Sequence, residues 1–499
     1  MGSVVGIDLG TTFSLVATLD ETGRPKIVPN SMGSNKTPSC VFETSPGVIE
    51  VGEYARRQSE NAPETSAVRF KRDMGTSKIH FVRGKPFTPT HLSGFVLKKL
   101  LADARAAIGR VDEAVVTIPA NFSHEARQAT MKAAKIAGLN VRFIINEPTA
   151  AALYYAFQKG AELSGIYAVY DLGGGTFDVS IIRVSGQEVE VLATGGIARL
   201  GGDDFDFALQ RIVRKKFRDQ HGTELQADEF TKNSAEEEKI ALSSRKQITV
   251  RVAKQLIDIR RDEFEEAISS LIAQVEMLCE TTIEEAKIDV SQIKSVFLAG
   301  GSTRVPVVID SVRRVFHQEP VSTGNVDEVV ALGAALYAAL RADQRNLSTS
   351  QRAALSSIKV SESTSKCFGT ISRTFDEVRN EHTTVNNILI RKGDKIPSQV
   401  TESFYTIYEG QRSVECLVTE SVSPETDPRF VKVIWRGELA LPEGRPENQE
   451  IAVTFSYDAN QIMHCSFVDV ATGMKTSVDL SMSADKKNDS TEIEKFTVR

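Results

Sequence analysis

Two segments of the sequence repeat one pattern centred on the tripeptide Asp-Leu-Gly. The first segment, "VVGIDLGTTFSLVATL", spans Val4 to Leu19, and the second, "YAVYDLGGGTFDVSIIRV", spans Tyr167 to Val184. In each, an apolar run precedes the tripeptide, and small or hydroxyl residues and a second apolar run follow it. The pattern predicts two β-hairpins whose glycine-bearing tips let the backbone approach a ligand closely. Each hairpin opens one half of an α/β region, which indicates a duplicated fold.

The tips of both predicted hairpins carry groups that bind phosphate. Successive backbone N–H groups in a glycine-rich turn form a concave anion-binding site, and hydroxyl donors come from Thr11, Thr12 and Thr176. Carboxylates that can hold Mg²⁺ through water, since this ion dehydrates reluctantly, come from Asp8, Asp171 and Asp178. Two ordinary hairpins with Asp-Gly turns are the alternative for either copy alone, but the repetition makes that alternative much weaker.

A third turn and two missing motifs narrow the kind of nucleotide site. The string "VFLAGGSTRVP", from Val296 to Pro306, is typical of a strand, a Gly300-Gly301 turn and a helix start, and helix N-termini with glycine attract phosphate. The same two glycines are also typical of close strand–helix packing. The sequence has neither the GxxxxGK[ST] nor the GxGxxG pattern, so the nucleotide-binding folds that depend on those motifs lose their main support.

The chain changes from an alternating α/β pattern to an all-β pattern at about Cys367. Strand-like runs such as "AVVTIP" and "VRFII" alternate with helix starts in the first two thirds, which favours an α/β domain with a mainly parallel sheet. Strand-like runs separated by turn signals follow Cys367 and predict a small all-β sandwich. The predicted organisation is an α/β domain over residues 1–342, a connection over 343–366, the sandwich over 367–482 and a polar tail over 483–499.

Composition and charge limit the classes of partner that the protein can be expected to have. The net charge of -6 and the absence of long basic runs give no reason to expect nucleic acid. The longest apolar run, Val329 to Leu340, is well short of the ~20 residues that span a membrane, so no membrane contact is expected. Five scattered cysteines are typical of free thiols in a reducing compartment, and a cytoplasmic location is expected.

Eight strings distributed from Gly6 to Ala335 carry a family resemblance. They are "GIDLGTTFS", "VTIPANF", "INEPTAAAL", "YDLGGGTFDVSII", "LGGDDFD", "EEEKIALSS", "LAGGSTRVP" and "DEVVALGAA". In this order they resemble the DnaK family, the seventy-kilodalton heat-shock chaperones. The resemblance implies an actin-like ATPase domain, with duplicated halves around a nucleotide cleft, followed by a peptide-binding β sandwich. Actins and sugar kinases share the ATPase fold but not this full set of strings.

The resemblance also implies an activity and its partners. The expected protein is an ATP-dependent molecular chaperone that hydrolyses ATP to ADP and phosphate to control the binding of unfolded or extended peptide. Its expected cofactors are ATP or ADP and Mg²⁺, with K⁺ as a further candidate ion. A J-domain co-chaperone and a nucleotide exchange factor are the implied protein partners.

Individual residues acquire roles by matching the family strings. The implied catalytic set is Lys71, Glu147, Asp171 and Thr176. In this set Lys71, in the string "FKRDMG", matches the lysine that contacts the γ-phosphate and the attacking water. Glu147 matches a glutamate of the water and metal network, and Asp171 matches the aspartate that orients the water. The Mg²⁺ shell adds Asp8 and Asp178 to Asp171. The implied nucleotide contacts are Gly10, Thr11, Thr12, Gly173, Gly174, Gly175, Gly201, Gly202, Glu236, Lys239, Ser243, Gly300, Gly301, Ser302, Arg304 and Asp327. Pro119 and Arg127 match a pair that relays nucleotide state to the second domain.

Several features depart from the family pattern. The stretches from Gly75 to Leu92 and from Leu242 to Phe264 are short, the second without room for an extra hairpin, as in a compact form of the family. Ile240 stands where some members place an arginine against adenine. The connecting segment, "AALSSIKV", is diluted by serines, which puts domain coupling and J-domain stimulation in doubt. We expect no helical lid, because the sequence ends where the family's lid would begin.

The β-rich region matches the family only loosely, and three functions compete. Phe404 and Val414 align with the peptide pocket, although plain sandwich core explains them at least as well. Besides a chaperone, the chain suits a nucleotide-sensing adaptor that binds one dedicated partner without a full chaperone cycle. A sugar kinase on the same fold is the third hypothesis, but it leaves the β-rich region unexplained.

Overall fold

The chain forms two compact units. The computed structural model describes residues 3–159, 164–185, 188–226, 228–322, 325–343, 347–356, 358–376, 380–458, 463–480 and 495–499. The first unit comprises Met1–Val360 together with Asn488–Arg499, and the second comprises Ser361–Lys487. The division after Val360 falls within the predicted connection over 343–366. The return of the last residues to the first unit was not predicted, because we expected only a polar tail over 483–499.

The first half of the first unit is built on the hairpin predicted from Val4 to Leu19. Its sheet has the order β11-β10-β1-β2-β3, with bounds β1 (Ser3–Asp8), β2 (Phe13–Leu19), β3 (Pro25–Val28), β10 (Val111–Ile118) and β11 (Val141–Asn146). β1 and β2 are antiparallel, whereas β1, β10 and β11 are parallel. Both faces are covered, which explains the continuous apolar runs: Val5 and Ile7 pack with Leu92 and Phe95 of α2 (Pro89–Ile108).

The second half repeats this plan around the second predicted hairpin. Its strands run in the order β17-β12-β13-β14, with bounds β12 (Ser164–Leu172), β13 (Phe177–Ser185), β14 (Glu188–Ile197) and β17 (Ile293–Ala299). β12 is antiparallel to β13 and parallel to β17. Asp171 and Asp178 are opposite each other at the tip of this hairpin. The register therefore places two of the predicted Mg²⁺ residues side by side.

Two alanine-rich helices, α4 (Glu147–Lys159) and α9 (Val329–Arg341), pack together in the first unit. Their small side chains allow a close approach: a Cβ on Gly333 would lie 1.7 Å from the carbonyl oxygen of Ala150. α9 also packs on β1, where a Cβ on Gly6 would lie 2.1 Å from the backbone nitrogen of Ala335. One core cluster includes residues of both helices and of β12, β13 and β14. These contacts fix the start of α4, which carries a predicted catalytic residue.

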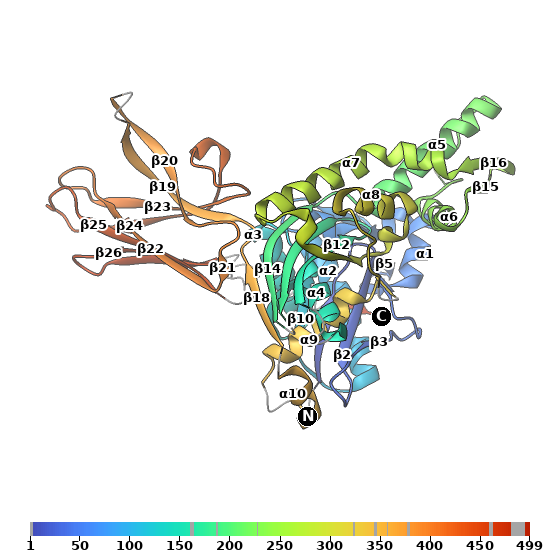
Figure 1. Cartoon of the computed structure of the whole chain (residues 1–499), viewed down its shortest axis with the longest axis horizontal. Helices are drawn as coiled ribbons and strands as arrows, with labels where there is room; N and C mark the ends of the chain where they lie inside the picture. Colours follow the sequence, from blue (N-terminus) through green and yellow to red (C-terminus); the bar gives the residue numbers. More distant parts are fainter. Residues whose placement is uncertain are drawn as a thin grey trace. The chain divides into compact units, whose positions relative to one another are not determined.

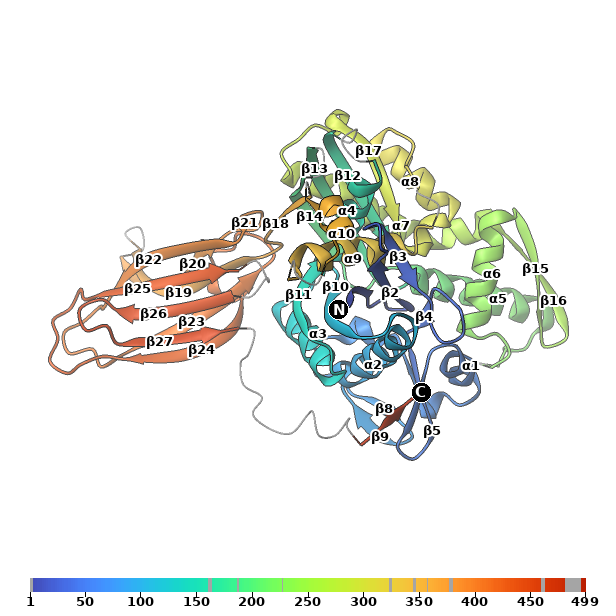
Figure 2. The same ribbon diagram turned by 90° about the horizontal axis from the view of Figure 1, so that it is seen from below.

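Smaller elements extend each half. In the first half, α1 (Glu53–Asn61) packs on a sheet of order β28-β6-β5-β7, with bounds β5 (Cys40–Ser45), β6 (Val48–Val51), β7 (Ser66–Val68) and β28 (Thr497–Val498). The hairpin of β8 (His80–Val82) and β9 (Lys85–Phe87) lies near β5 (Figure 2). In the second half, α5 (Gly202–His221), α6 (Lys232–Ser244) and α7 (Arg261–Glu285) pack around a further hairpin (Figure 1).

That further hairpin corrects one sequence expectation. We expected the segment from Leu242 to Phe264 to be too short for an extra hairpin, but β15 (Gln247–Val252) and β16 (Gln255–Arg260) form one there. The two strands are joined by only Ala253 and Lys254, which have φ of 47° and 62°. Positive φ at both central positions is the geometry of the tightest hairpin turns. Since glycine or asparagine usually marks such turns, the residue types gave no signal for it.

The second unit is a β sandwich, as the all-β pattern predicts. One sheet has the order β20-β19-β23-β24 and the other β22-β25-β26-β27. Their bounds are β19 (Cys367–Asp376), β20 (Glu381–Ile390), β22 (Ser398–Tyr405), β23 (Ser413–Ser421), β24 (Lys432–Ala440), β25 (Glu450–Tyr457), β26 (Met463–Asp469) and β27 (Lys475–Asp479). Buried and partly exposed residues alternate strictly along β25 and β26, the pattern of a strand with one face in the core.

The predicted connection over 343–366 contains regular structure. α10 (Thr349–Leu355) and β18 (Lys359–Ser363) lie within it. Leu355 and Ile358 of "AALSSIKV" are buried in the core cluster that includes α4 and α9, and Val360 packs against it partly buried. The serines that dilute this string therefore do not prevent it from packing on the first unit. Among the helices that the structure describes, none is both long enough and apolar enough to cross a membrane.

Candidate active site

A cavity of about 970 Å³ lies between the two halves of the first unit. The tips of both hairpins and the Gly300-Gly301 turn line it, as do residues of α1, α4, α5 and α6. Most of the predicted site residues are in its lining, namely Asp8, Gly10, Thr11, Thr12, Lys71, Glu147, Asp171, Gly173, Gly174, Gly175, Thr176, Gly202, Glu236, Lys239, Ser243, Gly300, Gly301, Ser302, Arg304 and Asp327. Asp178 and Gly201 were predicted for the site but are not lining residues.

The tips of the two hairpins meet at glycines. A Cβ on Gly174 would lie 2.0 Å from Thr12 Oγ1, and a Cβ on Gly175 would lie 2.5 Å from the side chain of Thr11. Gly201 packs against the same tip, since a Cβ there would lie 2.7 Å from the Gly174 backbone. Among the described residues the buried Thr12 hydroxyl has no hydrogen-bond partner. A buried donor of this kind is satisfied by a ligand or water, which suits a phosphate oxygen in the cavity.

Lys71 and Glu147 form a buried ion pair in the cavity. Lys71 belongs to a short 3-10 turn, Phe70–Asp73, and Glu147 is the first residue of α4. The Lys71 Nζ lies 2.6 Å from Glu147 Oε1, and both side chains are buried. Burial removes water from the ammonium group, so its charge acts more strongly on an anion placed beside it than it would at the surface.

Three further carboxylates interact with this ion pair: Asp171 and Asp178 are buried, and Asp8 is half-buried. Burial, followed by the negative charge of Glu147, raises the pKa of Asp8 to about 7 and that of Asp178 to about 8. The same two causes raise the pKa of Asp171 well above its ordinary value. Lys71 lowers all three pKa values but does not offset these effects. Such an excess of buried negative charge is costly without a cation, so the carboxylates fit a bound Mg²⁺.

The carboxylates suit Mg²⁺ held through water. No three His, Cys, Asp or Glu side chains in the described part of the chain stand close enough to bind one ion directly. Mg²⁺ usually keeps several of its waters and takes few protein ligands. Asp8 is held in place by Thr117, whose hydroxyl donates to Asp8 Oδ1 at 2.9 Å. Asp178 accepts the backbone N–H of Ala120 at 3.0 Å, so both carboxylates are oriented without a metal.

Ion pairs position the residues predicted for adenosine on α6. Lys239 Nζ lies 2.7 Å from Asp206 Oδ1 and donates to the carbonyl of Gly202 at 3.1 Å. Arg56 of α1 lies 2.7 Å from Glu236. The Arg56–Glu236 pair joins α1 in the first half to α6 in the second across the cavity that both residues line.

A second group of pairs lies at the Gly300-Gly301 turn. Ser302 Oγ donates to the carbonyl of Gly173 at 2.9 Å. Arg304 lies 3.3 Å from Asp327, which also accepts Lys36 at 3.0 Å. Ile240, which stands where some family members place an arginine against adenine, lines the cavity and is 62% exposed. The sequence did not reveal Lys36 or Arg56, because neither lies in a matching string and each finds its partner on a distant element.

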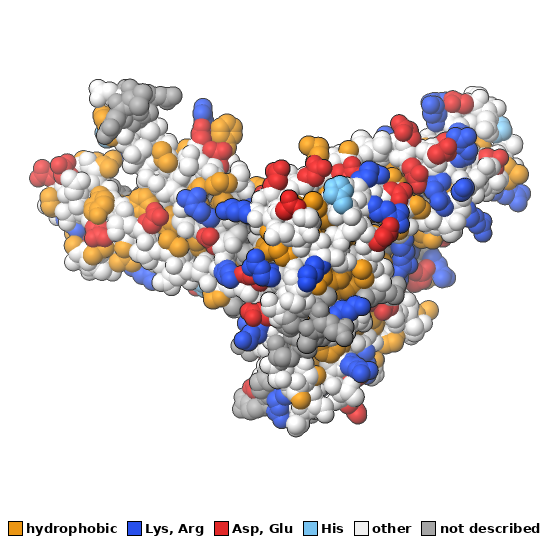
Figure 3. Space-filling view, viewed as in Figure 1, with side chains coloured by type: hydrophobic (Ala, Val, Ile, Leu, Met, Phe, Trp, Pro, Cys, Tyr) orange, Lys and Arg blue, Asp and Glu red, His pale blue; other side chains and the backbone are white. Residues whose placement is uncertain are grey.

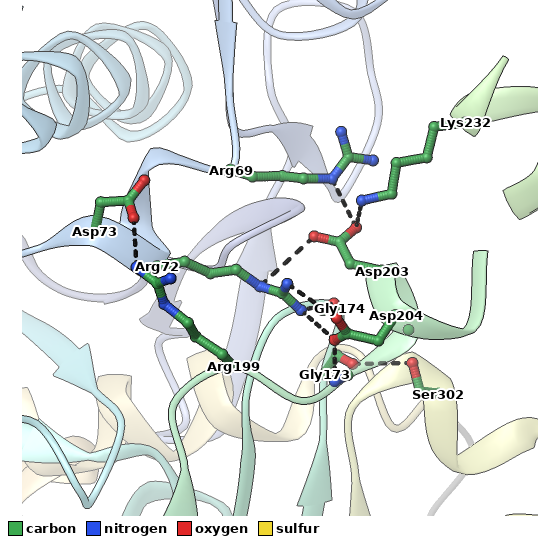
Figure 4. Close-up of polar contacts among 12 residues, drawn as sticks. Arg69, Arg72, Asp73, Gly173, Gly174, Arg199, Asp203, Asp204, Lys232 and Ser302 are labelled. Carbon is green, nitrogen blue, oxygen red and sulfur yellow. Dashed lines mark hydrogen bonds and ion pairs between the residues drawn. The ribbon is translucent and has the colours of Figure 1, made fainter. Parts of the chain in front are cut away.

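A further charged network also escaped prediction (Figure 4). Arg69 Nε lies 2.7 Å from Asp203 Oδ1, and Arg72 Nη2 lies 2.7 Å from Asp204 Oδ2. Lys232 adds a contact of 2.9 Å to Asp203. Burial alone would raise the pKa of Asp203, but Arg69 and Lys232 outweigh it and hold that pKa below its usual value. The network ties the segment that carries Lys71 to the start of α5, and its sequence signal was the acidic string "LGGDDFD".

Arg127 and Pro119, the predicted coupling pair, lie outside the cavity lining. Arg127 is buried on α3 (His124–Ile136), and its Nη2 donates to the carbonyl of Ala120 at 3.3 Å. Ala120 follows Pro119 and donates its own N–H to Asp178. A path of two hydrogen bonds therefore joins Arg127 to a carboxylate beside the cavity.

Phe404 and Val414 are both partly buried against the core of the second unit. Their packing is that of sandwich residues, which was the alternative to a peptide pocket. Among the residues of this unit that the structure describes, their packing does not distinguish these two from the other residues at the edge of the core.

Together the fold and the cavity define a class of protein. Two related α/β halves enclose glycine-rich tips, the buried Lys71 and a cluster of carboxylates, which are the parts that phosphoryl transfer to water requires. A β sandwich follows in the sequence. This is an actin-like ATPase domain joined to a β-sandwich domain.

Comparison with known proteins identifies the family. The family model described as "Hsp70 protein" matches residues 4–82 and 77–498. The chain is 37% identical over 493 residues to the "Chaperone protein DnaK" of Thermotoga neapolitana, covering 95% of this chain and 80% of the relative. The protein of the same name from Thermotoga petrophila matches with the same identity and coverage. The chain belongs to the Hsp70 family, and it is accordingly an ATPase and an ATP-dependent molecular chaperone.

Proposed function

We propose that the chain hydrolyses ATP in the cavity of the first unit and thereby controls how the β sandwich binds unfolded or extended peptide. The observation that carries this proposal is the Lys71–Glu147 pair, buried among carboxylates where the two glycine-rich tips meet. Phosphoryl transfer to water depends on positioning and charge neutralisation more than on covalent catalysis. A preorganised ammonium group in a site sheltered from water supplies both.

In the proposed reaction, a water oxygen forms a bond to the γ-phosphorus while the bond from phosphorus to the bridging oxygen of ADP breaks. Lys71 stabilises the charge on the γ-phosphoryl group and contacts the water, and Glu147 holds the ammonium in place at 2.6 Å. Asp171 is proposed to orient the water and to accept its proton, because burial raises the pKa of this carboxyl group. Thr12 and Thr176 supply hydroxyl donors to the phosphates.

A bound Mg²⁺ would neutralise charge on the β- and γ-phosphates. The carboxylates of Asp8, Asp171 and Asp178 would hold this ion through its water ligands. Its positive charge would offset the repulsion among them. K⁺ remains a further candidate ion at the same cluster. Around the nucleoside, the proposed contacts are the α6 residues Glu236, Lys239 and Ser243 and, from the Gly300-Gly301 turn, Arg304.

Peptide binding is proposed for the second unit. It exposes large apolar side chains, among them Tyr405, Tyr408 and Phe430, which are 57%, 55% and 71% exposed. Figure 3 shows hydrophobic side chains scattered over the visible face of this unit. An extended peptide can pair with a sheet edge while alternate side chains enter apolar pockets, and Phe404 and Val414 are the proposed pocket residues. Buried free cysteines in both units support a reducing, cytoplasmic setting.

ATP turnover by the full chain, measured with and without an unfolded apolar peptide, tests the proposal. We expect Mg²⁺-dependent release of phosphate that rises when peptide is added. ATP turnover that does not change when peptide is added would support the nucleotide-sensing adaptor instead. A J-domain protein and a nucleotide exchange factor, if they act here, should raise turnover further. Absence of phosphate release under all these conditions would contradict the assignment of Lys71 and its neighbours.

A further inference from the structure

Residues 495–499 add a strand to the first unit. β28 runs parallel to β6, with Thr497 opposite Val48 and Val498 opposite Ile49. The N–H groups of Thr497 and Arg499 donate to the carbonyls of Gly47 and Ile49, each at 2.9 Å. In return, the N–H of Val51 donates to the carbonyl of Arg499 at 3.1 Å. Without β28, β6 would present an unpaired edge, which readily pairs with an added strand.

A phenylalanine anchors this strand in an aromatic pocket. The Phe496 ring lies 5.6 Å from the Phe87 ring and 5.5 Å from the Phe95 ring, with interplanar angles of 66° and 71°. Phe87 and Phe95 are themselves 5.7 Å apart. These edge-on contacts are the favoured arrangement of aromatic rings. Phe496 and Val498 both pack against the core of the first half.

Two lysines also contact Phe496, one at its ring and the other at its backbone carbonyl. Lys85 Nζ lies 5.2 Å from the centre of the Phe496 ring, within the range of a cation–π contact. The fully buried Glu43 holds that ammonium group at 2.6 Å. Lys98 Nζ donates to the backbone carbonyl of Phe496 at 3.4 Å. The pocket therefore binds both the aromatic side chain, through its ring, and the extended backbone, through a carbonyl.

The alternation of exposure in this segment matches such a site. Lys495, Thr497 and Arg499 are exposed, whereas Phe496 and Val498 are partly buried. A strand that adds to an edge uses its backbone for affinity and every second side chain for specificity. The segment that suits the site is thus an extended one with an aromatic residue and an aliphatic residue two positions later.

We propose that the edge of β6, with the pocket of Phe87, Phe95 and Lys85, is a peptide-docking site of the ATPase unit, and that residues 495–499 are its resident ligand. The site lies on the first unit and is distinct from the peptide-binding role proposed for the β sandwich. It fastens the chain to the first unit a second time, after the β sandwich, because that unit comprises Ser361–Lys487 and the first unit resumes at Asn488.

The docking site adjoins an element of the nucleotide cavity. Val51, which bonds to Arg499, is followed by Gly52 and then by α1. Arg56 of α1 lines the cavity and pairs with Glu236 on the opposite half. The docked strand therefore extends the sheet from which α1 begins, although no residue of β28 itself lines the cavity.

Hydrogen exchange in the full-length chain tests whether the strand docks. Phe496→Ala removes the anchor, and Thr497→Pro removes the N–H that bonds to Gly47 while keeping the anchor. We expect both variants to lose at least about tenfold of the exchange protection at the Val51 amide, because that amide then opens locally. Phe81→Ala is the matched control, since Phe81 is 63% exposed on the neighbouring β8. Parental protection in both test variants would overturn the proposal.

A peptide added in trans tests whether the edge is a binding site. A peptide with the sequence of residues 491–499 should restore the protection of the Val51 amide in Phe496→Ala, and the same peptide with alanine at its phenylalanine should not. Reading the Val51 amide separates this site from the β sandwich, where the peptide could bind without affecting β6. Binding of the peptide that leaves Val51 unprotected would overturn the proposal, whatever the ATPase assay shows.

Discussion

At the scale of single residues, the buried ammonium group of Lys71 faces several carboxylates whose negative charge it only partly neutralises. Lys71 is the cation in contact with Glu147, and burial raises the pKa of each of Asp8, Asp171 and Asp178. ATP brings further negative charge into this cluster. In the proposed mechanism, Lys71 therefore matters most when charge on the γ-phosphoryl group is redistributed in the transition state, and less for holding the rest of the nucleotide.

The first prediction follows from this balance. Lys71→Ala should slow ATP hydrolysis by about 10²–10³, the usual cost of losing one preorganised electrostatic partner, while nucleotide affinity changes little. Single-turnover phosphate release and nucleotide binding, measured separately, check the two parts. Lys78→Ala is the control, because Lys78 lies nearby but is exposed and pairs with Asp73. Parental hydrolysis in Lys71→Ala would remove the central assignment of the site.

A second prediction concerns His464 of the β sandwich. Its ring nitrogens lie 2.6 Å from Asp479 and 3.4 Å from Asp458. Partial burial alone would lower the pKa of His464, but these two carboxylates outweigh it and raise that pKa. The folded state therefore binds the proton more tightly than the unfolded state, so the stabilisation is complete below the ordinary histidine pKa and is lost as pH rises through the raised pKa.

The effect should be small because the side chains are exposed. Surface ion pairs contribute at most about 1 kcal/mol after solvent screening. Urea unfolding of the parent and of His464→Gln at pH 5.5 and pH 8.5 measures it: the difference in free energy of unfolding between them should shrink at the higher pH. A difference that is the same at both pH values would show that the histidine's charge does not contribute.

Among single residues, those in contiguous strings were predictable and those in long-range ion pairs were not. Lys71, Glu147 and Asp171 lie in strings that match the family, and the structure gathers them in one cavity. Arg69 and Asp203 are 134 positions apart, and their contact depends on a left-handed backbone at Arg69, with φ of 60°. Neither spacing nor residue type encodes that geometry.

At the scale of elements, the crossing of α4 and α9 determines where Glu147 lies. The helices touch at Gly333 and Ala150, where even a methyl group does not fit. The sequence indicated a helix start after "VRFII" and showed an apolar run from Val329 to Leu340, but no helix was predicted over that run. The closeness of their contact was not predictable, since an alanine-rich helix also suits looser packing.

The third prediction compares two glycines inside helices. Gly333→Ala should destabilise the first unit by about 1–3 kcal/mol, the usual cost of overpacking, because its Cβ would meet the Ala150 backbone at 1.7 Å. In Gly94→Ala the nearest atom is a methyl carbon of Ile136 at 2.9 Å, which can move, and alanine favours the helix by roughly 1 kcal/mol over glycine. In thermal unfolding followed by circular dichroism, Gly94→Ala should have a clearly higher midpoint temperature than Gly333→Ala. Equal stability of the two variants would refute the packing argument.

At the scale of the whole molecule, the division into an ATPase unit and a β sandwich followed from the change of hydrophobic periodicity. The return of residues 495–499 to the first unit did not, because a segment with only two inward side chains leaves no detectable period. Its docking depends instead on an edge and a pocket formed by residues that lie more than four hundred positions earlier, near Val51 and Phe87. Such pairing is a property of the folded first unit.

The two units have separate reporters, which makes the last prediction possible. The chain has one tryptophan, Trp435. It is partly buried against the sandwich core and stacks on Phe467, with the ring centres 6.0 Å apart. The α-helices of the described residues all lie in the first unit, from α1 to α10. Tryptophan fluorescence therefore follows unfolding of the second unit, and circular dichroism at 222 nm follows mainly the first.

Nucleotide binding should shift the unfolding midpoint that only one of these two signals reports. A ligand at ~100 times its dissociation constant stabilises the state that binds it by about 2.7 kcal/mol. Because the cavity lies wholly within the first unit, saturating Mg·ADP should raise the urea midpoint seen by circular dichroism and leave the Trp435 midpoint in place. Mg²⁺ without nucleotide is the control. Equal shifts of both midpoints would mean that the units unfold as one cooperative body, and no shift in either would contradict nucleotide binding in the cavity.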